Sequence, residues 1–128
     1  MREIKFRGKG VITNYWFEGS LLTTEDGGVI YGKSVGSVKK ETIGQYTGLK
    51  DKNGKEIYEG DIIRSYDSEN KPIIHFIHWH NSNACYVATI PQYPCICSIV
   101  TRDWIEEYDK EIIGNIHDNP ELIKEVRQ

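Results

Sequence analysis

The chain is organised around residues 47–64, which read TGLKDKNGKEIYEGDIIR. Asn53 and Gly54 tolerate the positive φ angles that primed β-turns require, so this pair predicts a tight turn. Gly60 and Asp61 predict a second chain reversal a few residues later, and an apolar strand follows it directly. The stretch is therefore expected to supply two bends that fix how the neighbouring strands pair.

Other residues of the same stretch are also predicted to be structural. Gly48 is expected to permit a further backbone bend, and Asp51 and Asp61 are expected to cap turns through side-chain to backbone hydrogen bonds. Ile57 and Tyr58 are expected to fill the core or an interface. The lysines of the stretch alternate with acidic residues, so the local charge nearly cancels and a solvated turn is favoured over a basic binding loop.

Length and composition predict a globular β protein. A chain of 128 residues with 38% hydrophobic and 27% charged residues is typical of a single folded domain, here expected over residues 1–128. Tyr is the commonest aromatic, with 8 residues against 3 Trp and 3 Phe. Because aromatic and β-branched residues favour pleated, half-buried surfaces, we expect a mainly β, antiparallel fold.

Charge and hydropathy limit the partners and the compartment. The formal net charge of −3 weakens any proposal of wholesale binding to a phosphate backbone. The N-terminal residues lack the apolar run of a signal peptide, and no segment approaches the roughly 18 apolar residues of a membrane-spanning helix. We therefore expect a cytoplasmic protein with no membrane partner, in which the three cysteines remain thiols.

The pattern of apolar residues and turn signals predicts a series of short strands and two helical segments. A turn is expected at 25–28, a loop at 34–42, one or two helical turns at 103–108, and a short C-terminal helix after Asn119. This helix would begin with Pro120 and Glu121 and bury Leu122 with Val126. The expected strands cover residues 4–6, 11–17, 29–31, 43–47, 61–64, 73–80, 84–90, 95–100 and 111–116.

Three blocks of sequence resemble those of a known family. They are Arg2 to Arg7 (REIKFR), the segments QYTGLKD and GKEIYEGDI within residues 45–62, and the segments IGNIH and NPEL within residues 113–122. The chain resembles the YopX family, whose members are small proteins encoded by phages and prophages. The resemblance implies a β-rich fold with an SH3-like barrel element and a bacterial host cytoplasm. It implies no catalytic residues, and residues 65–108 carry no family signature.

The histidines and cysteines form the most chemically suggestive group. They are His75, His78, His80, Cys85, Cys95 and Cys97. The spacings His-x-His and Cys-x-Cys differ from the paired Cys-x₂₋₄-Cys and His-x₃₋₅-His spacings of ordinary zinc sites. The cysteines fall on expected strands, whereas a nucleophilic thiol needs an electropositive, partly exposed setting. We expect no metal, no cofactor and no catalytic residue, although the sequence leaves open whether these side chains converge in space.

One set of residues predicts an interaction surface. Basic and aromatic side chains gather near the N-terminus at Arg2, Lys5, Arg7, Lys9, Tyr15 and Trp16. Positive charge beside stacking aromatics suits single-stranded nucleic acid, and exposed Tyr and Trp equally mark protein interfaces. The acidic net charge favours the second interpretation. The sequence thus predicts a non-enzymatic protein that binds a protein partner or itself. Nucleic-acid binding is the alternative, and a metal-dependent or thiol enzyme is a third.

Overall fold

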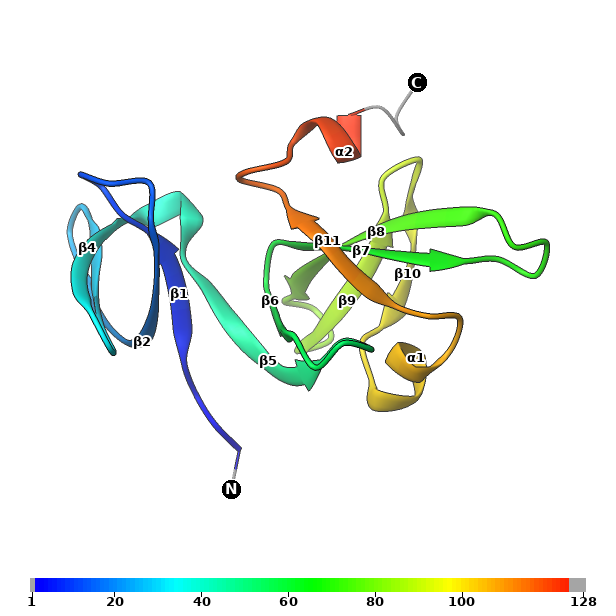
Figure 1. Ribbon diagram of the computed structural model, residues 1–128, viewed down its shortest axis with the longest axis horizontal. Coiled ribbons are helices and arrows are strands. Elements are labelled where there is room, and N and C mark those ends of the chain that lie inside the picture. Colours follow the sequence, from blue (N-terminus) through cyan, green and yellow to red (C-terminus); the bar gives the residue numbers. More distant parts are fainter. Residues whose placement is uncertain (1, 125–128) are drawn as a thin grey trace. The chain divides into compact units, whose positions relative to one another are not determined.

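The computed structural model describes residues 2–124 and consists mainly of β-strands (Figure 1). The strands form two antiparallel sheets, one of six strands and one of five. Contacts between residues divide the chain into two compact units, Met1–Gly48 and Leu49–Gln128. The prediction of a mainly β, antiparallel fold is confirmed, and the prediction of one domain over residues 1–128 stays a prediction. The strands of residues 2–124 form open sheets and close no barrel.

The first unit is a curled antiparallel sheet. Its strands are hydrogen-bonded in the order β4-β3-β2-β1-β5. An isolated bridge between Gly10 and Val38 brings the end of β1 back to β4. The elements are β1 (Phe6–Lys9), β2 (Trp16–Thr24), β3 (Gly27–Tyr31), β4 (Val35–Lys39), the short 3₁₀ helix η1 (Lys40–Thr42) and β5 (Gly44–Lys50).

The curl of this sheet depends on a glycine and a small core. A Cβ atom on Gly8 would lie 2.8 Å from the Val38 Cβ atom, closer than real carbon atoms approach. Gly8 therefore lets β1 pass directly over β4. Ile30 is fully buried and Val38 is 1% exposed, so burial of apolar surface holds the curled strands together.

Two sequence predictions in the first unit are wrong. Residues 34–42, expected as a loop, contain β4 and η1 because β4 pairs along its length with β3 and buries Val38. Residues 11–14, expected as strand, form a bend that the Gly10 N–H closes by donating to the Tyr15 oxygen at 2.9 Å. The apolar residues of that bend are exposed, with Ile12 at 96%, so hydrophobicity alone misled the strand prediction.

The second unit is a five-stranded antiparallel sheet with the order β10-β9-β8-β7-β11. β7 and β8 form a long hairpin (Figure 1, green). The short strand β6 (Glu56–Tyr58) follows β5 and pairs beside it. The remaining strands are β7 (Asp61–Tyr66), β8 (Pro72–His80), β9 (Cys85–Ile90), β10 (Tyr93–Ile99) and β11 (Glu111–Asn115).

The core of the second unit draws on most of its strands. Leu49, Tyr86 and Trp104 pack against it from the side. Its buried members are Ile57, Ile63, Ile77, Ala88, Val100, Ile105 and Ile112. Because Ile57 comes from β6 and Ile112 from β11, burial of this cluster ties the central stretch of the sequence to the last strand.

The central stretch forms the bends that the sequence predicts. Gly48, Gly54 and Gly60 have φ angles of +90°, +79° and +91°, which are costly for residues with a side chain. The Asp61 carboxylate caps the second bend by accepting the Tyr58 N–H at 2.8 Å. The bends at Gly54 and Gly60 and the cap at Asp61 are therefore confirmed. The primed turn expected at Asn53-Gly54 is wrong, because only Gly54 of the pair has a positive φ. Gly48 lies within β5.

Asp51 organises the first bend from a buried position, at 6% exposure. Its Oδ1 atom accepts the N–H groups of Asn53 and Lys55, both at 2.9 Å. Its Oδ2 atom accepts the Ile112 N–H of β11 at 2.9 Å. The predicted cap at Asp51 is confirmed, and the same carboxylate also fixes a strand 61 residues away in the sequence.

Both predicted helical segments are present. α1 (Arg102–Glu106) begins where the Thr101 hydroxyl accepts the Trp104 N–H at 3.1 Å. α2 (Glu121–Lys124) follows Asn119, whose side-chain oxygen accepts the Asn115 N–H at 3.2 Å. The predicted partner Val126 lies outside the described residues. None of the helices formed by residues 2–124 is long and apolar enough to cross a membrane.

Candidate functional site

The first unit contains a cleft lined by aromatic and basic side chains, which we call the aromatic–basic cleft. Its volume is about 430 Å³. The residues that line it are Lys5, Tyr15, Trp16, Phe17, Glu18, Gly19, Lys33 and Ser34. They come from the residues before β1, from the start of β2, and from the turn between β3 and β4.

Strand pairing places the basic and aromatic groups together. In the β1–β2 ladder Arg7 lies opposite Glu18 and Lys9 lies opposite Trp16. The Arg7 guanidinium lies over the Trp16 ring at 4.8 Å from its centroid, and this cation–π contact fixes the ring beside the cleft. The Lys5 ammonium group likewise lies over the Tyr46 ring at 5.2 Å.

Most of the predicted interaction surface converges here. Lys5, Tyr15 and Trp16 line the cleft, and Arg7 contacts its Trp16 wall. Lys9 is half-buried, and its main-chain N–H donates to the Thr42 hydroxyl at 2.9 Å.

Arg2 is the member of the predicted set that takes no part in this arrangement. It is exposed, lies ahead of β1 and is not among the residues that line the cleft.

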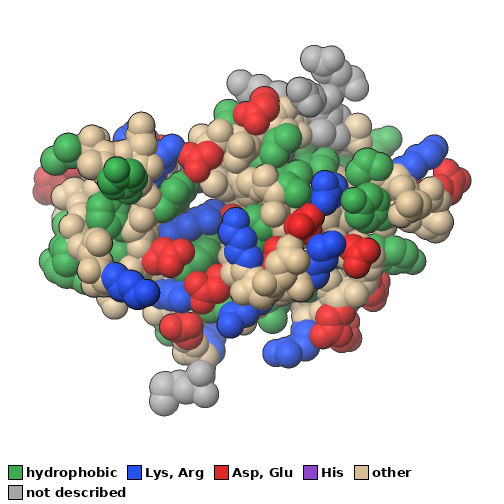
Figure 2. All heavy atoms as spheres, viewed as in Figure 1, with side chains coloured by type: hydrophobic (Ala, Val, Ile, Leu, Met, Phe, Trp, Pro, Cys, Tyr) green, Lys and Arg blue, Asp and Glu red, His purple; other side chains and the backbone are tan. Residues whose placement is uncertain are grey.

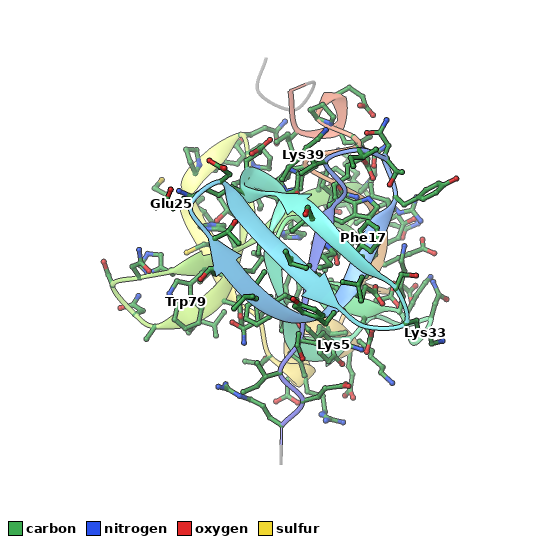
Figure 3. The ribbon with its side chains drawn as sticks, turned by 90° about the vertical axis from the view of Figure 1, so that its left-hand side faces the viewer. Lys5, Phe17, Glu25, Lys33, Lys39 and Trp79 are labelled. Atoms are coloured by element: carbon green, nitrogen blue, oxygen red, sulfur yellow. The ribbon has the colours of Figure 1, made fainter. Side chains whose placement is uncertain are left out.

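The structure adds residues that the sequence did not single out. Lys33 is exposed and lines the same cleft as Lys5, and Figure 3 shows both at one end of the sheet, with Lys39 at the other end. Phe17 contributes an aromatic wall. Lys33 escaped prediction because its position depends on β4, which the sequence pattern predicts as a loop.

A second, apolar pocket adjoins the cleft, and we call it the apolar patch. Its volume is about 450 Å³, and Phe17 lines both it and the aromatic–basic cleft. Its other residues are Gly10, Ile12, Thr13, Val29, Val35, Gly36 and Ser37. Ile12 and Val35 are 96% and 60% exposed, so this side of the first unit offers apolar area that folding has not buried.

The histidines and cysteines do not assemble into a metal site. Among residues 2–124, no group of three or more His, Cys, Asp or Glu side chains lies close enough together to hold a metal ion. The His78 ring bonds to the Thr89 hydroxyl at 2.7 Å. His80 lies opposite Cys85 in the β8–β9 ladder, while Cys95 and Cys97 are exposed on β10.

A serine–histidine pair lies inside the second unit. The Ser65 hydroxyl and the His75 Nε2 atom are 3.0 Å apart, the separation found between a nucleophile and its base. The two residues are 3% and 5% exposed, so a substrate has no path to the hydroxyl. The His75 ring also meets the Trp104 ring edge-on, with centroids 5.2 Å apart. This arrangement is that of a packed core.

Burial also sets the protonation of this region. Burial, and secondarily the positive charge of Lys110, lower the pKa of His75 from 6.5 to about 4. The Lys110 ammonium group donates to the Glu107 carbonyl at 2.6 Å and lies 4.6 Å from the Trp104 ring centroid. Burial lowers the pKa of Lys110 as well, and Glu107 partly offsets that shift. His75 is therefore neutral at pH 7.

Comparison with known proteins identifies the family. The crystal structure of protein EF1440 from Enterococcus faecalis is similar to this chain, with a TM-score of 0.65 and 23% sequence identity over 96% of this chain and 99% of that one. At this identity the likeness establishes the fold. The search of curated proteins found no match. A family model described as "YopX protein" matches residues 5–124, nearly the whole sequence, and this chain therefore belongs to the YopX family.

Proposed function

We propose that the protein is a non-enzymatic interaction module whose first unit binds an extended segment of a partner protein. The observation that carries this proposal is the continuity of the aromatic–basic cleft and the apolar patch through Phe17. Such a surface suits a segment that places an acidic side chain near Lys5 and Lys33 and apolar side chains against Phe17 and Val35.

The composition of the cleft supports this proposal. Tyr, Trp and Arg dominate the residues that contribute most to protein–protein affinity, because they bury large areas at modest entropic cost. Tyr15 is 73% exposed and so is available to a partner. The Arg7 guanidinium holds Trp16 in place before binding, which lowers the entropy lost when a complex forms.

Binding of single-stranded nucleic acid is the second candidate. The exposed Tyr15 ring beside Lys5 favours it, because bases stack on aromatic rings next to positive charge. Two features weigh against it. Arg7 already covers one face of the Trp16 ring, and the net charge of −3 repels a polyanion. On the face shown in Figure 2, basic and acidic side chains lie interspersed.

We also propose that the second unit is an SH3-like element. The strand order β10-β9-β8-β7-β11 supports this. Strands β7 to β10 form a meander, and after the helical turn α1 the chain returns so that β11 pairs with β7. A phage or prophage origin and a location in the host cytoplasm remain parts of the proposal.

Quantitative capture from host cells tests the proposed function. Tagged full-length protein is compared with Trp16→Ala and Lys33→Glu in the cleft, and with Lys52→Ala on an exposed turn of the second unit. We expect one protein to be captured stoichiometrically by the wild type and by Lys52→Ala. Both cleft variants should lose it. Equal capture by all four proteins would refute the cleft as the binding surface.

Titration with labelled oligonucleotides separates the two candidates. A protein that neutralises phosphates loses affinity steeply with salt, with a log–log slope of about −0.7 per contact on single strands. We expect no micromolar binding to mixed-sequence DNA or RNA at physiological salt by fluorescence anisotropy. Tight, salt-sensitive binding that Lys5→Glu and Arg7→Glu abolish would establish the nucleic-acid alternative instead.

A further inference from the structure

We propose that the protein forms a symmetric dimer by pairing β10 with β10 of a second copy, about a two-fold axis at Ser98. This interface lies in the second unit and is independent of the aromatic–basic cleft. β10 is the outermost strand in the order β10-β9-β8-β7-β11, and residues 2–124 supply no strand on its other side. Such an edge presents main-chain groups that can pair with another chain.

The hydrogen-bond pattern identifies which groups face the open edge. The Val100 N–H donates to the Tyr86 oxygen at 3.0 Å, and Ser98 lies opposite Ala88 two residues earlier in the same register. Because bonded and non-bonded pairs alternate in an antiparallel ladder, Ser98 and Val100 bond to β9. The main-chain groups of Cys97 and Ile99 therefore point away from the sheet.

These outward groups select the register. An axis at Ser98 places Cys97 opposite Ile99 of the other copy, and Ile99 opposite Cys97. The N–H and C=O groups of both residues are then satisfied by four main-chain hydrogen bonds. An axis at Cys97 would pair Cys97 with Cys97 of the other copy, and an axis at Ile99 would pair Ile99 with Ile99. Either arrangement forms only two main-chain hydrogen bonds between these residues.

The side chains of β10 suit a second copy of the same strand. No residue from Tyr93 to Ile99 is charged, so pairing the strand with itself brings no like charges together. Its apolar side chains are exposed, with Tyr93 at 56%, Ile96 at 54% and Ile99 at 60%. Edge strands of monomeric proteins are usually protected by charge, and this one carries none.

The irregular half of β10 limits the assembly to two copies. The register with β9 shifts between Tyr93 and Cys97, and Pro94 within that interval lacks an N–H group. Bulges and prolines of this kind block further strand addition. The regular segment from Cys97 to Ile99 is short and meets its own copy about a two-fold axis, which closes the assembly as a dimer.

Light scattering of the full chain across protein concentrations is the first test. We expect the mass to rise from 14.8 kDa towards twice that value. Ile99→Lys should raise the dimer dissociation constant by about tenfold or more, because it places a charge on the paired edge. Leu22→Lys, at a similarly exposed position of β2, should leave the constant unchanged. A wild-type monomer at every concentration would overturn the proposal, and so would unchanged dimerisation of Ile99→Lys.

A disulfide formed across the axis tests the register. In a background with Cys85, Cys95 and Cys97 replaced by Ser, Ser98→Cys places two thiols at directly opposite positions, about 4.5 Å apart between Cα atoms. Diamide accepts the two protons and two electrons released as the disulfide forms. We expect rapid cross-linking of Ser98→Cys and little of the control Ser82→Cys, in the exposed β8–β9 loop. Equal rates for the two variants would overturn the assigned axis.

Discussion

At the scale of single residues, buried polar groups hold the second unit together. Asp51 joins the first bend to β11, and His75 sits neutral between Ser65 and Trp104. The sequence predicts the turn cap at Asp51, because an aspartate two residues before Asn-Gly can accept the backbone N–H groups of the turn. The bond from Ile112 to Asp51 could not be predicted, because the two residues are 61 positions apart. The contact between Ser65 and His75 could not be predicted either, since these residues approach each other only through the β7–β8 ladder.

Replacing Asp51 with Ala should destabilise the protein by about 3 kcal/mol, because three backbone N–H groups lose their acceptor. Asp51→Asn keeps one oxygen and should cost less. Lys52→Ala, exposed beside it, should cost almost nothing. Urea denaturation of the three variants measures the differences. A cost for Asp51→Ala no greater than that of Lys52→Ala would show that the carboxylate is not what holds the turn.

The protonation of His75 should make stability depend on pH. Its folded pKa, about 4, lies below its unfolded value of 6.5, so the unfolded state binds the proton first as pH falls. The contribution of neutral His75 is fully present above pH 6.5 and is lost progressively down to about pH 4, for a total of about 3 kcal/mol.

The difference in unfolding free energy between the wild type and His75→Gln isolates this effect, because the other titrating groups are common to both proteins. We expect the difference to change between pH 6.5 and pH 4. Lys52→Ala, on an exposed turn, serves as the control, and its difference from the wild type should stay constant across this range. A constant difference across that range would mean that His75 titrates in the folded protein as it does in the unfolded chain.

At the scale of elements, local turn signals predicted more than apolar patterns did. Asn53-Gly54 and Gly60-Asp61 specify their bends through residues adjacent in sequence, and both bends are present. The apolar pattern does not predict β4, because its single buried residue, Val38, follows the small residues Gly36 and Ser37 and no period-two alternation is visible. Part of the candidate site was therefore predictable. Lys5, Tyr15 and Trp16 come from one hairpin, whereas Lys33 reaches the cleft only through the β3–β4 turn.

The first bend offers a test of backbone geometry alone. Gly54 has a φ of +79°, and a Cβ atom there would meet nothing within 4 Å. Gly54→Val should therefore destabilise the protein by roughly 1–3 kcal/mol through backbone strain without any clash. Thermal or urea denaturation measures this against Lys52→Ala. If Gly54→Val lowered the free energy of unfolding by less than Lys52→Ala does, the turn would have adopted another conformation without loss of stability.

At the scale of the whole molecule, the proposed interaction module rests on the contrast between exposed and buried groups. The aromatic–basic cleft and the apolar patch expose side chains that could contact a partner, whereas the Ser65–His75 pair is closed to substrates. The family and the mainly β class could be predicted because they depend on sequence blocks and on composition. The division into two units could not, because no linker composition marks the boundary after Gly48.

Removal of metal should have no effect on the folded protein. We expect elemental analysis of protein purified without added zinc to find no stoichiometric metal, and chelator to leave the melting temperature unchanged. The spacing of His78, His80 and the cysteines motivates this expectation. One zinc ion per chain, with a lower melting temperature after chelation, would restore the metal-dependent enzyme as a candidate.

The central claim is that the first unit binds a partner protein through the aromatic–basic cleft. Site-specific photo-cross-linking tests this claim most directly. A photoreactive amino acid replaces Tyr15 in the full chain, and a matched variant carries it in place of Lys52. After irradiation in cells that express the protein, we expect a protein adduct of one defined mass from position 15 and none from position 52. Adducts to nucleic acid from position 15, or the same protein adducts from both positions, would contradict it.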